Sequence, residues 1–376
     1  MLTYFSVIGF KNFKEKIVFD LKNISRYTFN EKQIKNNTIN KGIIYGKNGE
    51  GKSNLGEAIF DIELNLMLTV SVPDLNIYKP TLKGIYKNME YDKDVEFEYH
   101  FEFDNDEIVY QYSKKESMYV NKEKLYINKK LLLSNNEGDV TCYIKEAENV
   151  NFANKNIKSS ALFFLFNFIK FDENNILNKL FSFLKGMLWF RCLNQGNEAM
   201  GAQTRYDYIE DTIVRKNKLT EYQLFLNSFG LNYQLQSRQI TNPFFPQQKI
   251  YTIEAKIGKN TAPLNMLLST GSIALELYFY WSITFSTVTF LFIDEFDAFY
   301  HYEISESIIK LLNEQINFQS FVTTHNTSLM STKLMRPDNL FLISNNKIKP
   351  LCDCTTSELR NGHNLEKIYK EGGFDE

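Results

Sequence analysis

The sequence of this 376-residue chain predicts an α/β fold whose buried strands end in loops rich in polar residues. Residues 42–60 read as a short apolar strand, a glycine-rich loop and a helix. Residues 287–293 form an apolar run that closes on two acids, and residues 321–324 form a strand that closes on a histidine. From residue 264 onward strands alternate with helical patterns, which is typical of a parallel sheet.

The composition indicates a globular protein, because 43% of the residues are hydrophobic and 15% are aromatic. This length accommodates two or three lobes around a large core. The formal net charge of −2 gives no overall basic field that would attract nucleic acid, and only a local basic patch is compatible with it. Without a CxxC pair or zinc-like spacing, the cysteines are expected to be free thiols in a reducing cytosol. They are Cys142, Cys192, Cys352 and Cys354.

The apolar stretches predict buried elements and no membrane partner. Residues 161–171 are too short to span a bilayer and are broken by Asn167 and Lys170. Residues 273–293 are long enough, but Glu276 interrupts them, so we expect a buried helix followed by a buried strand. The chain enters a strand pattern directly, without a charged-then-apolar signal segment. We therefore expect a cytoplasmic protein.

The N-terminal part predicts antiparallel strands. Residues 2–10 and 15–21 read as two strands joined by a polar turn, and residues 22–41 read as a loop. Residues 95–112 alternate between apolar and polar side chains and predict a β-hairpin. The hairpin turn, Asp104 to Asp106, is interpreted as a solvated loop and not as a metal site, because Asp and Asn suit turns for backbone reasons.

The middle of the chain shows weaker patterns. Residues 118–133 read as short strands, residues 134–158 as a polar loop and residues 159–190 as apolar helix. A helix over 219–229 and an alternating strand over 248–257 follow. The sequence contains no internal repeat and no heptad run long enough for a coiled-coil arm.

Residues 46–53, GKNGEGKS, match the phosphate-loop pattern G-x-x-x-x-G-K-[ST] at every fixed position. The glycines let the backbone curl so that successive N–H groups face phosphates. Lys52 would reach the outer phosphates of ATP, and the Ser53 hydroxyl would coordinate Mg²⁺. A glycine-rich surface turn is the alternative, but the flanking strand and helix favour a nucleotide site. The predicted nucleotide contacts here are Gly46, Asn48, Gly49, Gly51, Lys52, Ser53 and Asn54.

Asp294 and Glu295 close the apolar run as in a Walker B motif. Asp294 would hold Mg²⁺ through water, and Glu295 would orient and deprotonate the attacking water during in-line phosphoryl transfer. The alternative is a strand that merely ends in two exposed acids. The phosphate loop earlier in the chain favours the catalytic interpretation.

Two further segments flank the acids. Ser269, Gly271 and Ser272 precede an apolar helix and would form an anion-binding cap from hydroxyl and backbone donors. His325 follows the strand 321–324 and would hydrogen-bond the γ-phosphate and report its loss. A lone histidine is usually structural, but its place one strand–helix unit beyond the acids favours the sensing role.

In this order the motifs resemble those of the ATP-binding-cassette (ABC) type ATPase heads of the RecF, SMC and overcoming-lysogenisation-defect (OLD) group. The chain is most similar to stand-alone bacterial AAA ATPases of phage-defence and abortive-infection (PARIS-like) operons. The resemblance implies a P-loop NTPase head with an N-terminal antiparallel β-lobe and a mixed, partly helical insertion. It divides the chain into a first half of the head over 1–115, an insertion or lid over 116–255 and a second half over 256–376.

The resemblance also implies roles for single residues. The opening IGFKNFKEKIVFDL resembles the group's first hairpin, which makes Lys11, Phe13 and Lys14 candidates for the adenine pocket. The segment DEFDAFYH resembles a Walker B and D-loop, which places Asp297 at a dimer seam and His301 at the histidine that usually follows. The signature reads Leu-Ser-Thr-Gly-Ser, so it lacks the first glycine and the glutamine of the common Leu-Ser-Gly-Gly-Gln. A Q-loop glutamine cannot be placed.

The resemblance further implies that ATP·Mg²⁺ is shared in a head-to-head homodimer or higher oligomer, with residues 269–272 acting on the other copy's nucleotide. Glu295, Lys52 and His325 would carry the chemistry. No Asp-x-Asp cluster of an OLD-type nuclease follows His325, so we expect a separately encoded effector. The leading hypothesis is an ATPase sensor or scaffold in an antiviral or toxin–antitoxin-like system.

The alternative hypothesis is a RecF-like repair ATPase that binds DNA. A transporter cassette is disfavoured, because the chain opens with the RecF-like hairpin and carries a large insertion. Only scattered basic residues support the DNA alternative. They are Lys155, Lys158, Arg215, Lys216 and Lys218.

Overall fold

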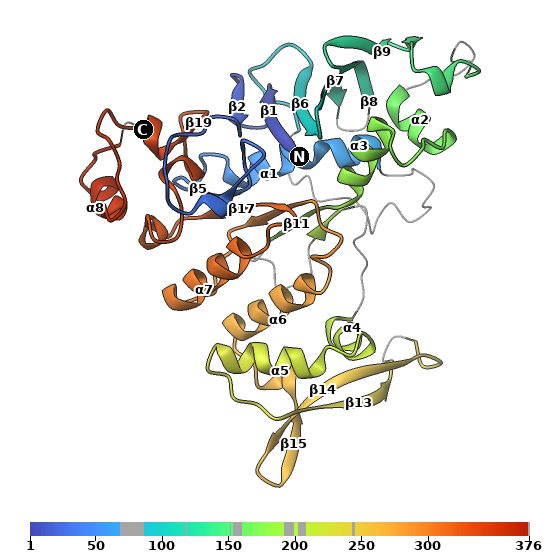
Figure 1. Cartoon of the computed structure of the whole chain (residues 1–376). Helices are drawn as coiled ribbons and strands as arrows, with labels where there is room; N and C mark the ends of the chain where they lie inside the picture. The colour runs from blue at the N-terminus through green and yellow to red at the C-terminus, as the bar shows by residue number, and fades with distance from the viewer. Residues whose placement is uncertain are drawn as a thin grey trace.

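The computed structural model arranges the chain in layers, with helix α1 between two large sheets and a smaller lobe at one end (Figure 1). The structure describes residues 1–67, 86–116, 119–150, 152, 160–191, 199–201, 208–242 and 245–374. Lys155, Lys158 and Cys192 of the sequence analysis lie outside these ranges.

The first large sheet, here called the antiparallel sheet, has the order β10-β9-β8-β7-β6-β1-β2. The predicted hairpin is present as β6 and β7, with Asp104 at a positive φ of 55° in its turn. The prediction of a polar loop over residues 134–158 is wrong for residues 134–142, because the strands continue to Cys142 through a Glu137-Gly138 turn with positive φ at both residues. The strands are β1 Leu2–Ile8, β2 Ile17–Asp20, β6 Val95–Phe103, β7 Asp106–Glu116, β8 Tyr119–Ile127, β9 Lys130–Asn136 and β10 Asp139–Cys142.

The second large sheet, here called the parallel sheet, has the order β12-β11-β16-β17-β5-β18-β19, and its five central strands are parallel. Phe290 and Phe292 of β16 pack toward α1, while Leu291 and Ile293 pack toward the helices of the other face. Burial on both faces explains why these strands read as unbroken apolar runs. The strands are β5 Lys41–Tyr45, β11 Met187–Arg191, β12 Ala199–Met200, β16 Phe290–Asp294, β17 Gln319–Thr324, β18 Leu340–Ser344 and β19 Lys347–Pro350.

Strand β11 corrects the prediction of helix over residues 159–190. Its apolar run, Met187 to Phe190, cannot be distinguished from buried helix by periodicity alone, and Gly186 caps the helix before it. Residues 22–41, expected to be a loop, also contain two short strands. The remaining helices and strands are α1 Lys52–Leu66, α2 Ala161–Phe168, α3 Ile176–Lys185, α4 Ile209–Arg215, α5 Leu219–Ser228, α6 Thr270–Ser282, α7 Tyr302–Asn313, α8 Leu365–Lys370, β3 Ile34–Lys35, β4 Thr38–Ile39, β13 Leu235–Thr241, β14 Lys249–Ile257 and β15 Asn260–Pro263. The 3₁₀ turns are η1 Glu31–Gln33, η2 Lys145–Ala147, η3 Leu264–Met266, η4 Thr327–Leu329, η5 Pro337–Asn339 and η6 Leu351–Asp353.

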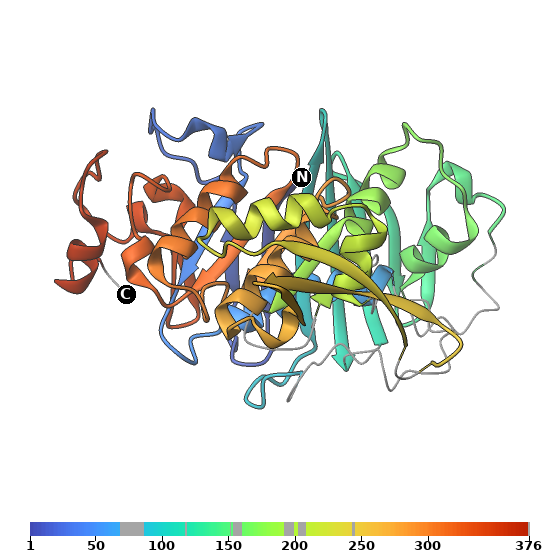
Figure 2. The same cartoon turned by 90° about the horizontal axis from the view of Figure 1, so that it is seen from below.

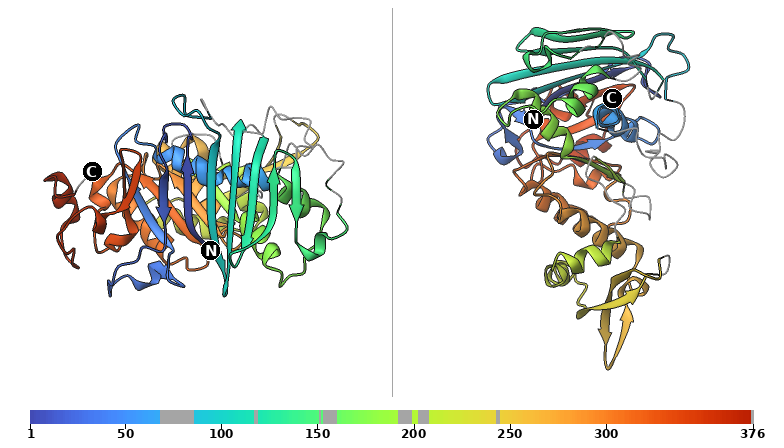
Figure 3. Two further views of the ribbon diagram at one scale, coloured as in Figure 1. Left: turned by 90° about the horizontal axis from the view of Figure 1, so that it is seen from above. Right: turned by 90° about the vertical axis from the view of Figure 1, so that its right-hand side faces the viewer.

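Helix α1 is fixed to the antiparallel sheet by a stripe of polar contacts, and it crosses beneath the strands (Figure 3, left). Asp61 accepts hydrogen bonds from Lys114 Nζ at 2.6 Å, from Tyr112 Oη at 2.8 Å and from Tyr86 Oη at 3.0 Å. One turn to each side, Tyr99 Oη donates to Ala58 O, and Asn65 Nδ2 donates to Tyr110 Oη. These positions, three and four residues apart, share one face of the helix.

The distal lobe comprises α4, α5 and the three-stranded sheet β13-β14-β15, and it lies against α6. Figure 3 (right) shows it at the end of the molecule opposite the antiparallel sheet, and Figure 2 shows α5 lying across the helices that cover the parallel sheet. Tyr222 Oη of α5 donates to Glu276 Oε1 of α6 at 3.0 Å. Burial raises the pKa of Glu276 to about 7. The range 116–255, expected to be one insertion, thus supplies strands to both large sheets as well as most of this lobe.

Within the described residues, no helix has both the length and the apolar character needed to cross a bilayer.

We predict that Lys114→Met destabilises the fold strongly. The side chains of Lys114 and Asp61 are 2% and 0% exposed, so the variant leaves a buried carboxylate without its cation, which costs about 3 kcal/mol of unfolding free energy. Urea denaturation measures this change. Lys14→Met is the control, because Lys14 pairs with Glu90 in solvent. Equal stability of the two variants would contradict the importance of the buried pair.

Candidate functional site

The register of the parallel sheet brings the predicted site residues to one edge. Thr324 pairs with Tyr45, and Arg191 pairs with Asp294 in the adjoining strands β11 and β16. The carboxyl ends of parallel strands meet at the same edge, where ligands of open α/β sheets bind. The loop 46–51, the two acids and His325 therefore all leave the sheet on this side.

The phosphate loop is held by the turn between β1 and β2. Gly51 is the N-cap of α1, with a φ of 105°, and a Cβ there would lie 2.6 Å from Asn12 Nδ2 and 2.7 Å from the Phe13 ring. Only glycine fits this position. Asn12 Nδ2 donates to Glu50 O at 3.2 Å, and Asn12 Oδ1 accepts from Asn54 Nδ2 at 2.7 Å. Asn12 thus joins the loop to the helix that follows it.

Lys52 lies folded across the loop. Its Nζ donates to Gly46 O at 2.8 Å and to Lys47 O at 3.2 Å, and it lies 3.3 Å from His325 Nδ1. Burial lowers the pKa of Lys52, while Glu295 and Asp294 act in the opposite direction. A phosphate oxygen would replace the carbonyl oxygens that this ammonium now contacts. Asn48 and Gly49 lie on the exposed side of the loop.

Asp294 is buried at the end of β16. Thr323 Oγ1 donates to Asp294 Oδ1 at 2.7 Å and accepts from the backbone N–H of Glu295 at 2.7 Å. The other carboxylate oxygen, Oδ2, has no hydrogen-bond partner in the described part of the chain. Arg191 Nε lies 3.3 Å from it as an ion pair.

The residues predicted to hold Mg²⁺ fit that ion chemically. Ser53 and Asp294 offer a hydroxyl and a carboxylate, which are the oxygen ligands that hard cations prefer. Oδ2 of Asp294 has an ion pair but no hydrogen-bond partner among the described residues, and a metal or a metal-bound water satisfies a buried polar atom of this kind.

Glu295 and His325 face each other beside Lys52. Glu295 has a φ of 50°, an uncommon value for a non-glycine residue, and its Oε1 lies 3.8 Å from His325 Nε2. Burial raises the pKa of Glu295, and the negative charge of Asp294 adds to this effect. Burial lowers the pKa of His325, and the Lys52 ammonium lowers it further. The imidazole is therefore neutral at pH 7.

Asp297 is hydrogen-bonded to the end of β17, the strand that precedes His325. Both of its carboxylate oxygens accept from Thr324 Oγ1, at 2.7 and 2.8 Å. Burial raises the pKa of Asp297. His301 is the N-cap of α7, a short distance along the same loop.

The predicted signature forms the N-terminal cap of α6. Ser269 is the N-cap of α6, and its Oγ accepts from Ser272 N at 3.3 Å. A Cβ on Gly271 would lie 2.7 Å from Phe299 O. Among the described residues, Ser269 and Ser272 hydrogen-bond each other and make no hydrogen bond to residues 46–51.

The first hairpin does not offer an adenine-facing ring. Phe13 is fully buried beneath Gly51, so the interpretation of this ring as an adenine contact is wrong. Lys11 forms a buried ion pair with Glu57, and Lys14 pairs with the exposed Glu90 at 2.8 Å. Phe13 therefore packs against the phosphate loop, whereas Lys11 and Lys14 are engaged by carboxylates.

Sequence reasoning missed four residues of this edge. Asn12 contacts the phosphate loop, Arg191 and Thr323 contact Asp294, and Glu57 of α1 pairs with Arg191. Arg191 closes an apolar run just as Asp294 does, which is the one signal that would have identified it. The Q-loop glutamine stays unplaced.

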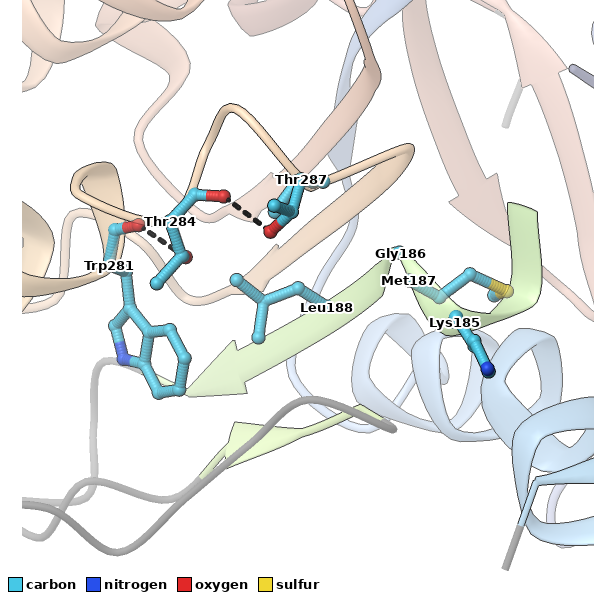
Figure 4. Close-up of a pocket in the computed structure, with 8 residues that line it drawn as sticks. Lys185, Gly186, Met187, Leu188, Trp281, Thr284 and Thr287 are labelled. Carbon is cyan, nitrogen blue, oxygen red and sulfur yellow. Dashed lines mark hydrogen bonds between the residues drawn. The ribbon is translucent and has the colours of Figure 1, made fainter. Parts of the chain in front are cut away.

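A small pocket lies at the other end of β11 (Figure 4). Its volume of about 40 Å³ is lined by Met187, Leu188, Trp281 and Thr284, among others. This volume suits about one water molecule. The pocket lies near the amino-terminal end of the strand, so it is separate from the edge that carries the phosphate loop.

Comparison with known families gives a match over residues 43–331 to the family described as "AAA domain, putative AbiEii toxin, Type IV TA system". No curated protein matches the chain. Among solved structures, the chain is similar to an SMC head bound to the C-winged helix domain of ScpA, with 16% identity, 93% of this chain and 96% of that chain covered and a TM-score of 0.46. The SMC head domain from Thermotoga maritima is 15% identical, with 93% of this chain and 97% of that chain covered and a TM-score of 0.43. The recombination mediator RecF with ATP is 14% identical, with 93% of this chain and 99% of that chain covered and a TM-score of 0.38.

We predict that the pKa of His325 lies below the usual histidine value of about 6.5 and rises in Lys52→Met. The substitution removes a cation that disfavours the imidazolium, whereas burial, the larger cause, stays. NMR titration of the imidazole resonances in nucleotide-free protein measures both values. Arg238→Gln, on the distal lobe, is the charge-matched control and leaves the His325 midpoint unchanged. A midpoint that stays or falls in Lys52→Met would refute the proposed coupling.

Proposed function

This chain belongs to the AAA family described as a putative AbiEii toxin of type IV toxin–antitoxin systems, an ATPase family of the ABC type, and from that premise we propose that it binds and hydrolyses ATP. The observation that carries the proposal is the chain of contacts through one histidine. His325 lies 3.3 Å from the Lys52 ammonium and 3.8 Å from the Glu295 carboxylate. It therefore joins the predicted phosphate-binding cation to the predicted base.

The roles follow from these positions. The backbone of residues 46–51 surrounds the phosphates at the N-terminus of α1, and Lys52 neutralises the outer phosphates. Glu295, whose pKa burial raises, accepts a proton from the attacking water. The neutral His325 donates one hydrogen bond toward the γ-phosphate. Mg²⁺, when held by Ser53 and the Asp294 carboxylate, would supply charge neutralisation for the phosphates.

We propose that the site is completed by a second copy of the chain. The signature cap, Ser269 to Ser272, makes no hydrogen bond to its own phosphate loop among the described residues, so its capped helix end is free to meet the γ-phosphate of another copy. The γ-phosphate then lies between two positive helix ends. Hydrolysis removes this charge, so the nucleotide state sets the geometry of the dimer.

We propose that this cycle serves as a sensor or scaffold in an antiviral or toxin–antitoxin-like system and controls a separately encoded effector. The family membership supports this role. A RecF-like role on DNA finds little support in the charges. Arg215 pairs with Asp211 at 2.7 Å and Lys218 with Glu221 at 2.7 Å, so two of the five candidate basic residues already have acidic partners.

We predict that Lys52→Ala abolishes ATP binding, because it removes the cation that neutralises the outer phosphates. Glu295→Gln should bind ATP normally, hydrolyse it at least about 100-fold more slowly and accumulate as a dimer. Phosphate release and light scattering on a sizing column measure turnover and mass. Glu306→Gln is the control, since Glu306 lies on α7, away from the acids after β16, and pairs with Lys310 at 2.6 Å. Unchanged turnover in Glu295→Gln would refute the base assignment.

The role is tested by capture from the native host with ATP-loaded Glu295→Gln as bait and Lys52→Ala as the matched negative. We expect a protein partner that binds the first variant and not the second, because only the first reaches the closed state. Nuclease-sensitive recovery of DNA in place of a protein would favour the RecF-like alternative.

A further inference from the structure

Four charged side chains form one buried series at the candidate site. Lys11 pairs with Glu57, Arg191 Nη2 donates to Glu57 Oε1 at 3.2 Å, and Arg191 Nε lies 3.3 Å from Asp294 Oδ2. The exposed fractions of these side chains are 8%, 6%, 15% and 1% in the order Lys11, Glu57, Arg191, Asp294. Arg191 thus bridges a carboxylate on the phosphate-loop helix and the carboxylate predicted to hold the metal.

The two contacts of Arg191 differ in kind. Toward Glu57 the guanidinium makes a hydrogen bond with good geometry, whereas toward Asp294 it makes an ion pair only. Arg191 Nε and Asp294 Oδ2 both have no hydrogen-bond partner in the described part of the chain, although they lie 3.3 Å apart. A buried donor or acceptor without a partner is costly, so both atoms would gain from a rearrangement.

A metal ion at Asp294 would meet Arg191 directly. The ion or its bound water would compete with Arg191 for the Asp294 carboxylate, and like charges close together repel strongly in a buried site. The guanidinium has a second anion within reach, because Glu57 already accepts from it. Trp189, two residues earlier on β11, offers a ring centroid 5.0 Å from the guanidinium carbon and limits its movement to this neighbourhood.

We propose that Arg191 is a positioning residue that neutralises Asp294 when the site lacks metal and moves onto Glu57 when Mg²⁺ arrives with the nucleotide. Arg191 therefore competes with Mg²⁺ and raises the Mg²⁺ concentration that nucleotide binding requires. This inference rests on the proposed nucleotide-binding function.

The experiment measures binding of a fluorescent ATP analogue as a function of Mg²⁺ concentration, and again in excess EDTA. In Arg191→Gln the half-saturating Mg²⁺ concentration should fall about tenfold, because the competing cation is gone. Binding in EDTA should weaken, because Asp294 then repels the nucleotide unscreened. Opposite changes in the two conditions distinguish competition from a general loss of structure. Arg191→Lys keeps the charge and should stay near the unaltered protein.

Glu57→Gln provides an independent test, in which the half-saturating Mg²⁺ concentration should change in the opposite direction. It weakens the second partner of Arg191, holds the guanidinium at Asp294 and should raise the Mg²⁺ requirement. Arg238→Gln is the matched control, since Arg238 pairs with Glu254 at 3.0 Å on the distal lobe. An unchanged or higher Mg²⁺ requirement in Arg191→Gln, or a lower one in Glu57→Gln, overturns the inference. Absence of nucleotide binding to the unaltered chain at every Mg²⁺ concentration overturns the proposed function, and this inference with it.

Discussion

The parallel hydrogen-bonded register of β11, β16, β17 and β5 is the constraint on which the candidate site depends. Each strand ends within a residue or two of its neighbour, so side chains that are about 30 to 280 residues apart in the sequence share one edge. The register also explains why a residue of β17 can hold the two acids that follow β16. Thr323, at the end of β17, fixes both Asp294 and the backbone of Glu295 on the adjoining strand. A shift of one residue would turn each of these side chains to the other face of the sheet.

Among the described residues of this edge, the buried charged side chains have polar or oppositely charged partners. Lys52 lies against carbonyl oxygens and His325, and Arg191 lies between two carboxylates. Both carboxylate oxygens of Asp297 accept from the Thr324 hydroxyl. Burial of isolated ions is costly, whereas paired ions are tolerated and become costly only when one partner is removed. A nucleotide carries several negative charges, so we expect its binding to change the partners of Lys52 and Arg191 together.

The sequence predicted the parts of the fold whose chemistry is local. The phosphate loop, the acids after β16 and the serine cap of α6 each depend on a few adjacent residues, and α1, β16, β17 and α6 are found close to the predicted ranges. Strand β11 was missed because a run buried on both faces has no period. Asn12 and Glu57 were missed because their partners lie in other segments, and no local pattern marks a contact between a hairpin turn and a loop 38 residues away. Phe13 shows the opposite error, since its position was predicted and its burial was not.

The polar stripe of α1 has a mechanical consequence. Ala58, Asp61 and Asn65 hold the helix to the antiparallel sheet through tyrosine hydroxyls and a buried ammonium, each at a defined distance along the helix axis. A small translation of α1 along that axis would stretch all of these bonds together, so the resistance to sliding is stiff and cooperative. We therefore expect the helix and the antiparallel sheet to move as one unit, with the phosphate loop at the N-terminal end of the helix. A displacement of the phosphate loop would then also displace the strands of the antiparallel sheet. Relative movement would have to occur on the opposite side of the parallel sheet.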